Sequence, residues 1–293
     1  MESRVEPGRS PGQDRTVLTA TLGRPAPRGL IGPAAGAPAT PRPQIRRAIA
    51  PNATVVSRID VTRSIALYRV RADETVPPFE AGQYFALGLD VDGRFLQRPY
   101  STASAVGTAQ ELEFLIRLVP GGAFTTQLWN VRPGDRIWMG PPKGLFTLRH
   151  GDRRTHLFIS TGTGLAPFMS MTDALLRSDP GSSIVLLHGA SHASELAYRD
   201  RLENWAADGR INYVPTISRP ADPANTGWSG ATGRVETVVP QVCRMFDLRP
   251  LETVAYLCGN PDMIEAASVE LAGVGFAQEA IIREHYWTSS EAR

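Results

Sequence analysis

The chain has 293 residues, enough for two domains of ordinary size, and its content of hydrophobic (42%) and charged (20%) residues is ordinary for a globular protein. Its two cysteines, Cys243 and Cys258, are too few for a disulfide framework, a four-cysteine zinc site or a four-cysteine iron–sulfur cluster, so we expect no bound metal and a reducing, cytoplasmic location. No apolar run reaches the roughly 18 residues of a membrane span, and the net charge of +2 predicts no nucleic-acid surface.

Residues 1–51 differ in composition from the rest of the chain. They contain nine prolines and six glycines, with eight arginines and three acids, so their balance is +5 and that of the remaining residues is −3. Such a segment buries too little apolar surface to offset chain entropy, and we predict a disordered N-terminal tail. Its arginine content is also typical of an organelle transit peptide, but no amphipathic stretch supports that interpretation.

Residues 52–150 are predicted to form an all-β antiparallel barrel. Short apolar runs with strand-like alternation are separated by turn signals such as Pro77-Pro78 and Asp92-Gly93. Several short strands at this spacing are typical of a small barrel. The runs are Val55-Val56, Ile65 to Tyr68, Gln83 to Leu87 and Glu111 to Ile116.

Residues 151–293 are predicted to form an α/β domain, because strands and helices alternate from Gly151 onward. This alternation is typical of a parallel sheet with right-handed crossovers and a nucleotide-binding crevice. The expected strands are His156 to Ser160, Ser183 to His188, Ile211 to Ile217 and Thr253 to Cys258. The expected helices are Leu165 to Ser178, Leu196 to Trp205 and Met263 to Ala272.

Three short motifs occupy positions where such domains bind cofactors. Arg98-Pro99-Tyr100-Ser101 ends a strand of the barrel, Gly162-Thr163-Gly164 joins the first strand and helix of the α/β domain, and Cys258-Gly259-Asn260-Pro261 follows its last clear strand. Together with the two predicted domains, these motifs resemble the ferredoxin–NADP(+) reductase family, of the bacterial flavodoxin/ferredoxin–NADP(+) reductase type, over residues 52–293.

The resemblance assigns the first motif to FAD. It implies that Arg98 pairs with the flavin pyrophosphate, a role that suits a planar guanidinium. Tyr100, with Pro99, would lie against the isoalloxazine ring, and Ser101 would act catalytically near flavin N5, the atom that receives hydride. Without a ligand, the same residues would be an edge-strand arginine and a half-buried tyrosine.

A second flavin contact is expected after the turn Gly121-Gly122. Main-chain N–H groups at a helix N-terminus attract anions, and the family resemblance places a phosphate contact on the residues that start this helix: Ala123, Phe124, Thr125 and Thr126. A capped short helix without a ligand is the alternative, since threonine is a common N-cap. Because this turn follows shortly after Arg98 in the chain, the phosphate contact is favoured over the capped helix without a ligand.

The two later motifs are assigned to NADP. Glycines let the main chain approach a pyrophosphate, and the resemblance implies that the first turn binds it through Thr161, Gly162, Thr163 and Gly164. It further implies that Cys258 lies beside the nicotinamide C4 during hydride transfer, with Gly259 and Asn260 bordering the ring. A buried structural thiol is the alternative for Cys258.

Two arginines favour NADP over NAD. Arg219 after a predicted strand, and Arg234 after Thr232-Gly233, match family arginines that bind the 2′-phosphate, which requires positive charge. A third arginine of some family members is replaced here, where Ala190-Ser191 follows His188-Gly189.

The C-terminal run Arg283 to Trp287 is similar to the ends of one bacterial subgroup of these reductases. The resemblance implies that Tyr286 or Trp287 covers the flavin face and is displaced by nicotinamide. Six residues follow Trp287, in departure from that pattern, and an aromatic anchor on the final strand is the alternative.

These assignments predict a monomeric ferredoxin/flavodoxin–NADP(+) reductase that takes hydride from NADPH and passes single electrons to ferredoxin or flavodoxin. Arg58, Arg63 and Arg94 are candidates for a docking patch, by position only. Two alternatives stay open: an NADH-dependent reductase component of an oxygenase, and a flavin-binding electron-transfer subunit without turnover of its own.

Overall fold

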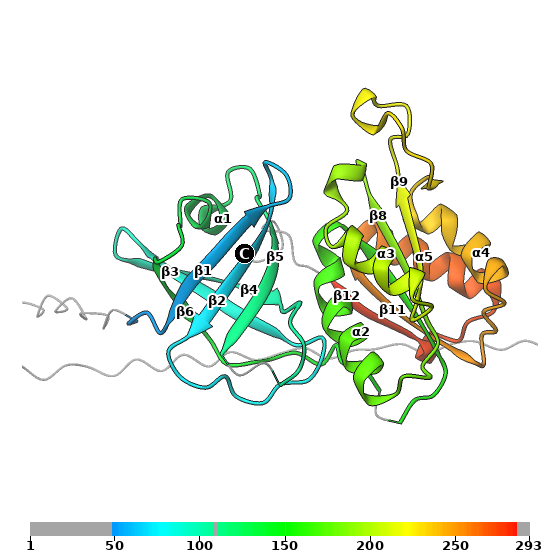
Figure 1. The fold of residues 1–293 in the computed structure, drawn as a ribbon, viewed down its shortest axis with the longest axis horizontal. Coiled ribbons are helices and arrows are strands. Elements are labelled where there is room, and N and C mark those ends of the chain that lie inside the picture. The colour runs from blue at the N-terminus through cyan, green and yellow to red at the C-terminus, as the bar shows by residue number, and fades with distance from the viewer. Residues whose placement is uncertain (1–48, 108–109, 150, 286–293) are drawn as a thin grey trace, which may run out of the picture. The chain divides into compact units, whose positions relative to one another are not determined.

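The computed structural model describes residues 49–107, 110–149 and 151–285 (Figure 1). Most of the predicted tail, residues 1–48, lies outside this range, so its disorder stays a prediction. Among the described helices, none has the length and apolar character needed to cross a bilayer.

The N-terminal part is an antiparallel sheet whose described strands follow the order β4-β3-β6-β1-β2-β5. A bridge between Thr102, just after β4, and Phe114 in β5 joins the two edges, so the sheet closes into a barrel, as predicted. The strands are β1 (Ala53–Asp60), β2 (Ile65–Ala72), β3 (Tyr84–Val91), β4 (Arg94–Ser101), β5 (Glu111–Arg117) and β6 (Arg136–Met139).

Alternating side chains build the barrel core. In β2, Tyr68 and Val70 are fully buried, whereas Arg69 between them is exposed. Phe85 of β3 and Phe114 of β5 meet inside the barrel with ring centroids 6.2 Å apart. Burial of each such side chain contributes about 2 kcal/mol, which makes the barrel a firm support for the end of β4.

The C-terminal part is a parallel sheet, with the described strands in the order β10-β9-β8-β7-β11-β12. The strands are β7 (Thr155–Thr161), β8 (Ile184–Ala190), β9 (Asn212–Ile217), β10 (Ala231–Thr232), β11 (Thr253–Gly259) and β12 (Ile281–His285). The helices around it are α2 (Ala166–Ser178), α3 (Arg199–Ala207), α4 (Val235–Met245) and α5 (Pro261–Val274). Barrel plus α/β sheet is the predicted fold class, which is confirmed.

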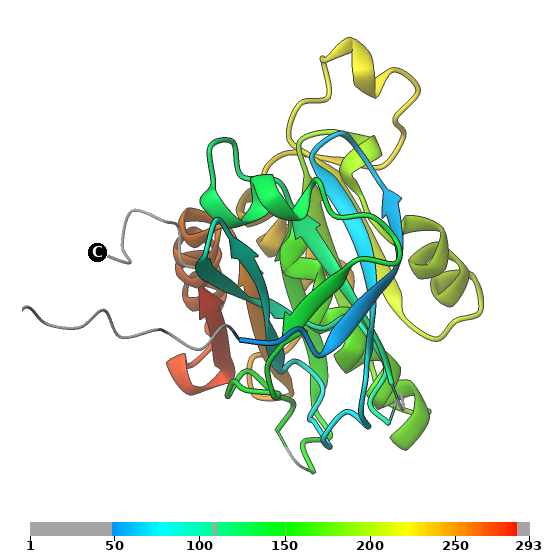
Figure 2. The ribbon, with the colours of Figure 1, turned by 90° about the vertical axis from the view of Figure 1, so that its left-hand side faces the viewer.

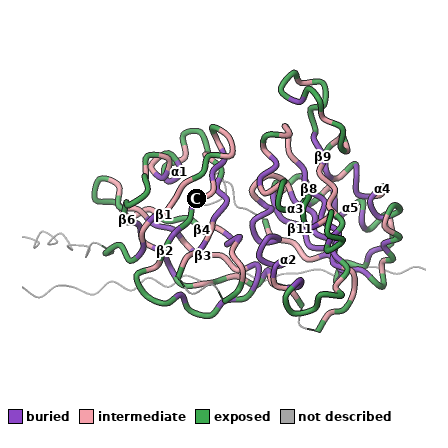
Figure 3. Tube along the Cα trace, in the orientation of Figure 1, coloured by how far each residue is buried: buried purple, intermediate pink, exposed green. Residues whose placement is uncertain are grey.

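Helices cover both faces of the parallel sheet. In β7, Phe158 packs with α2 and α3, whereas Leu157 and Ile159 pack with α4 and α5. The inner strands β8 and β11 are therefore buried along nearly their whole length (Figure 3). One excursion, between β9 and β10, projects from the sheet and is drawn in yellow (Figure 2).

The strand order reverses direction between β7 and β11. From β7 the chain proceeds to β8, β9 and β10 on one side, and β11 and β12 lie on the other. Ligands of such sheets bind beyond the carboxyl ends of the strands at this switch point. The turns that start at Thr161 and Gly259 both lie there.

Candidate functional site

The predicted flavin motif occupies the end of β4, at one edge of the antiparallel sheet. Arg98 and Pro99 are exposed, and within the described residues the Arg98 guanidinium has no acidic partner. The Tyr100 ring packs on Phe124, with centroids 6.0 Å apart, and burial raises the pKa of its phenol, which therefore stays neutral. Ser101 is only 3% exposed. In succession, β4 presents an exposed cation, an aromatic ring and a buried hydroxyl.

Helix α1 (Ala123–Leu128) starts beside this strand, so the structure brings the two predicted flavin elements together. The first N–H groups of a helix lack partners inside it, and Ala123 and Thr126 are exposed there. The Thr125 hydroxyl, by contrast, accepts from the Val119 N–H (3.1 Å) and donates to the Val119 carbonyl (3.3 Å). A phosphate here would meet main-chain N–H groups and the Thr126 hydroxyl, not the Thr125 side chain.

The turns after β7 and β11 interlock. A Cβ on Gly164 would lie 2.3 Å from the Cys258 carbonyl oxygen, and a Cβ on Gly259 (φ +139°) would lie 2.4 Å from the Thr161 hydroxyl. That hydroxyl accepts a hydrogen bond from the Asn260 N–H (3.0 Å). Neither glycine position has room for a side chain, because the two turns pack directly against each other and both glycines are buried. Thr161, Gly162 and Thr163 remain half-buried, so a ligand can reach the main chain of this turn there.

The remaining residues of these turns have distinct surroundings. Gly162 (φ +53°) faces the Arg117 guanidinium of β5, whose Nη2 would lie 3.1 Å from a Cβ there. Thr163 lies in a short 3₁₀ turn and is half-buried. The Asn260 side chain accepts from the Met263 N–H (3.3 Å) and caps α5. Its amide therefore shapes the turn, a role that the sequence did not predict.

Ser101 and Cys258 converge on a third residue, Glu284. The Ser101 hydroxyl donates to Glu284 Oε2 at 3.3 Å, and Cys258 Sγ lies 3.9 Å from the same oxygen. Strand pairing explains the second contact, because Cys258 in β11 and Glu284 in β12 are direct neighbours in the register. The end of β4 thus meets the end of β11 at one carboxylate, so the structure brings the two predicted cofactor motifs together.

Burial raises the pKa of Glu284 from 4.5 to about 7, against the opposing effect of the hydrogen bonds from Ser101 and Cys258. A buried carboxyl with a raised pKa, in contact with one residue of each predicted cofactor motif, is a candidate functional group. Sequence analysis missed this residue and treated it as part of the C-terminal aromatic run. The strand that carries it, Ile281–His285, shows no alternation of apolar and polar residues, so no local signal in the sequence pointed to Glu284.

The two arginines predicted for the 2′-phosphate follow neighbouring strands. Ile217 ends β9 and pairs with Thr232 in β10, so the segments that carry Arg219 and Arg234 leave the same edge of the sheet. The Arg219 guanidinium is exposed and forms no ion pair within the described residues. Arg234 is paired with Glu236 in the first turn of α4, which offsets part of its charge.

The other predicted residues are the two C-terminal aromatic residues and the three arginines proposed for docking. Tyr286 and Trp287 lie outside the described residues. Among the docking candidates, Arg63 and Arg94 are exposed. The Arg58 guanidinium lies 4.7 Å from the Trp129 ring centroid and donates to the Trp129 carbonyl (2.6 Å). These contacts engage the guanidinium within the barrel itself.

Comparison with known proteins agrees with this geometry. Residues 52–148 match the family model of the oxidoreductase FAD-binding domain, and residues 158–269 match that of the oxidoreductase NAD-binding domain. Ferredoxin–NADP reductase B of Sorangium cellulosum is 37% identical over 175 residues, which cover 59% of this chain and 70% of that protein. The ferredoxin–NADP reductase of Pseudomonas aeruginosa is 32% identical over 216 residues, covering 67% of this chain and 80% of that protein.

A second kind of relative is the reductase component of phenol 2-monooxygenase from a Pseudomonas species, which is 31% identical over 240 residues; the chain spans 65% of its length. Among solved structures, a ferredoxin NADP+ reductase from Neisseria gonorrhoeae with bound FAD and NADP matches with a TM-score of 0.71 at 25% identity, over 80% of this chain and 98% of that one. The chain is an FAD- and NAD(P)-binding oxidoreductase, and it belongs to the ferredoxin–NADP reductase family.

Proposed function

We propose that this protein is a ferredoxin/flavodoxin–NADP(+) reductase, which oxidises NADPH and delivers electrons to ferredoxin or flavodoxin. The observation that carries the proposal is the convergence of Ser101, Cys258 and Glu284, because it joins the predicted flavin strand to the predicted nicotinamide strand. Bound FAD would supply the redox chemistry, accepting hydride and releasing electrons singly. The names of the bacterial reductase relatives support the same assignment.

The residues of the barrel fit a planar, anionic cofactor. Arg98 is an exposed guanidinium without an acidic partner in the described chain, and a diphosphate would supply its counter-charge. The N-terminal N–H groups of α1 lie beside the same strand and would bind a second phosphate oxygen. Tyr100, with Pro99, would support the ring system, and Phe124 would hold the tyrosine in place.

The α/β domain would bind NADPH with its nicotinamide at the carboxyl ends of β7 and β11. The half-buried main chain from Thr161 to Thr163 would bind the pyrophosphate, and Cys258 would border the ring. Ser101 and Glu284 would hold a proton between the hydroxyl oxygen and Oε2, close to the reacting atoms. Outside the described residues, Tyr286 or Trp287 is proposed to cover the flavin face until nicotinamide displaces it.

Arg219 and Arg234 are proposed to bind the 2′-phosphate that distinguishes NADPH from NADH. Both leave the same edge of the sheet, and an arginine there offers bidentate contacts to a phosphate. Cys243 is a buried free thiol, which suits the proposed reducing cytoplasm. We further propose a monomer, with domains spanning residues 52–150 and 151–293.

The proposal is tested on the purified full chain. A yellow protein with bound FAD, reduced faster by NADPH than by NADH under anaerobic conditions and able to reduce ferredoxin or flavodoxin, is the expected result. A colourless preparation that takes up no added FAD would overturn the assignment of the barrel. A yellow protein reduced faster by NADH would overturn the assignment of Arg219 and Arg234.

One observation favours a second candidate, an NADH-dependent reductase component of an oxygenase. Arg234 is already paired with Glu236, and Ala190-Ser191 provides no third arginine, so the positive charge for a 2′-phosphate is modest. The name of the phenol 2-monooxygenase relative supports this candidate. The comparison of NADPH with NADH separates the two functions.

A further inference from the structure

The excursion between β9 and β10 carries Arg219 and is anchored by a buried amide, that of Asn225. This residue is 3% exposed and ends the short 3₁₀ turn Pro223–Asn225. Its Oδ1 accepts from the Ala193 N–H (2.8 Å), while its Nδ2 donates to the Arg219 carbonyl (2.7 Å) and the Ser191 carbonyl (3.3 Å). The partners fix the orientation of the amide, because an N–H requires the oxygen and two carbonyls require the nitrogen.

These three hydrogen bonds join the ends of two strands. Ser191 and Ala193 follow β8, Arg219 follows β9, and the Ser218 N–H donates to the Ala190 carbonyl (2.9 Å). Asn225 therefore fixes the main chain of Arg219 against the segment after β8. Under the proposed function, that segment and Arg219 border the same phosphate site.

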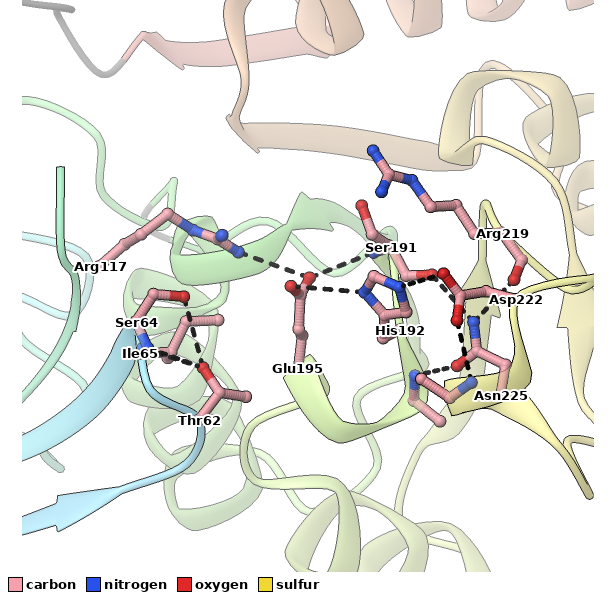
Figure 4. Close-up of polar contacts among 12 residues, drawn as sticks. Thr62, Ser64, Ile65, Arg117, Ser191, His192, Glu195, Arg219, Asp222 and Asn225 are labelled. Atoms are coloured by element: carbon pink, nitrogen blue, oxygen red, sulfur yellow. Dashed lines mark hydrogen bonds and ion pairs between the residues drawn. The ribbon is translucent and has the colours of Figure 1, made fainter. Parts of the chain in front are cut away.

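A second, polar connection runs beside the amide (Figure 4). His192 Nε2 lies 3.2 Å from Asp222 Oδ2, and His192 Nδ1 lies 3.7 Å from Glu195 Oε1. Glu195 Oε2 accepts from the Ser191 N–H (3.3 Å) and faces Arg117 Nη2 of the barrel at 3.7 Å. The excursion is thus held at Asp222 as well as at Asn225. Both residues donate to the Arg219 carbonyl, Asp222 through its main-chain N–H (3.1 Å) and Asn225 through its side chain (2.7 Å), so of these two bonds only that of Asn225 depends on a side chain.

The Arg219 side chain is left available by this arrangement. Its guanidinium points away from Asn225 and Asp222 and has no dashed contact to the residues drawn (Figure 4). Fixing the main chain of an arginine limits where its guanidinium can reach, so less freedom is lost when an anion binds. The neutral Asn225 amide does not itself attract the guanidinium. The pKa of Asp222 is lowered chiefly by the hydrogen bond from the Ala224 N–H, and Arg219 is close enough to that carboxyl to contribute.

We propose that Asn225 is a positioning residue for nucleotide selectivity: it holds Arg219 at the site of the 2′-phosphate and so sets the preference for NADPH over NADH. This inference rests on the proposed function, because it requires Arg219 to bind that phosphate. It predicts that loss of the Asn225 amide weakens phosphate recognition and leaves recognition of the rest of the nucleotide unchanged.

The test measures binding, independently of turnover, with two nucleotides that differ by one phosphate. Adenosine 2′,5′-bisphosphate carries the 2′-phosphate and adenosine 5′-monophosphate lacks it, and calorimetry on the FAD-loaded protein gives the Kd of each. We expect Asn225→Ala to raise the Kd of the bisphosphate about tenfold and to leave the Kd of the monophosphate within about twofold of the wild-type value. Asn225→Ser, which can keep one of the hydrogen bonds, serves as the milder variant and is expected to show a smaller loss.

Two controls make the result specific. Thr226→Ala changes the next residue, removing a hydroxyl that donates to the Pro223 carbonyl (2.8 Å), and is expected to bind both nucleotides as the wild type does. In a double variant that also carries Arg219→Ala, removal of the Asn225 amide is expected to cause no further loss of affinity for the bisphosphate, since the amide acts through the arginine.

The outcomes separate the two proposals. If the wild type itself does not prefer the bisphosphate, the proposed NADP function is wrong. If the wild type prefers it and both Asn225 variants keep that preference, the function stands and the role of Asn225 is overturned. A loss of equal size for both nucleotides also overturns the role, because selectivity would then be unchanged.

Discussion

The Ser101 hydroxyl donates to the Glu284 carboxylate at 3.3 Å, although the two residues lie 183 positions apart in the chain. One closes a strand of the barrel and the other lies on the last described strand of the α/β sheet. Because burial raises the pKa of Glu284 to about 7, the Glu284 carboxyl carries a proton in only part of the molecules at neutral pH. The charge of this pair is therefore set by pH in the physiological range.

We predict that the rate of NADPH oxidation rises as the pH passes through about 7. Oxidation places positive charge on the nicotinamide, and an ionised Glu284 nearby would stabilise that charge. Glu284→Gln is expected to lower kcat about tenfold and to flatten this part of the pH profile. Glu279→Gln, an exposed acid just before the same strand, is the control. An unchanged inflection in Glu284→Gln would show that another group titrates.

The same carboxyl is expected to make stability depend on pH. Its pKa in the folded protein, about 7, lies above the usual 4.5, so the folded state binds the proton more tightly than the unfolded state. By linkage, the free energy of unfolding falls as the pH rises from 4.5 to about 7, by at most about 3 kcal/mol. Urea unfolding at both ends of that interval tests this, and Glu284→Gln is expected to lose less stability across it than the wild type.

Gly259→Ala is expected to disrupt the nicotinamide turn while the protein keeps its flavin. The added Cβ would lie 2.4 Å from the Thr161 hydroxyl at a φ of +139°, so we expect a loss of about 1–3 kcal/mol in stability and a higher KM for NADPH. Gly273→Ala in α5 is the matched control, because a Cβ there meets nothing within 4 Å and is expected to stabilise the helix slightly. A normal KM in Gly259→Ala would contradict the placement of the nucleotide.

Arg98→Ala is expected to lower the affinity for FAD at least tenfold, because the pyrophosphate would lose its ionic contact with the exposed guanidinium. The ratio of flavin absorbance to protein absorbance, followed during dialysis, measures the effect. Arg94→Ala at the start of the same strand is the control and is expected to retain its flavin. Equal retention by both variants would place the pyrophosphate elsewhere.

Glu236→Gln is expected to increase the preference for NADPH. The substitution removes the acid that pairs with Arg234, so the guanidinium gains freedom to contact a 2′-phosphate. We expect the KM for NADPH to fall a few-fold, about the effect of one surface charge, with that for NADH unchanged. Glu270→Gln, exposed on α5, is the control. A parallel change for both nucleotides would mean that Arg234 does not contact the phosphate.

Much of the fold was predictable because the local patterns agree with the tertiary structure. The predicted strands of the parallel sheet each lie within two residues of the observed ones, since their burial is nearly continuous, as the sequence suggests. In the barrel only the run Glu111 to Ile116 matches as well, and the other three runs end four residues before β1, β2 and β3 do. Helix α4 was missed, although Val235, Val238, Val239 and Val242 form one buried face. Pro240 inside the helix masks that periodicity, and packing against the sheet overrides its cost.

Site residues that belong to a motif could be predicted from the sequence. Residues that matter only because the fold brings them next to such a motif could not. Ser101 and Cys258 belong to recognisable motifs, whereas Glu284 gains its importance from the register of β12 beside β11. Asn225 is likewise an ordinary turn residue in the sequence, and its three partners come from segments that only the parallel sheet brings together. Spacing along the chain carries no information about such contacts.

The position of β12 at the edge of the parallel sheet also affects the order in which the site is assembled during translation. The barrel needs nothing beyond its own strands to close at Thr102 and Phe114, so Ser101 can be in place early. The carboxylate of Glu284 emerges from the ribosome after every other described strand. A nascent chain would therefore complete its barrel first, and the contact of Glu284 with Ser101 and Cys258 would be the last part of the site to form.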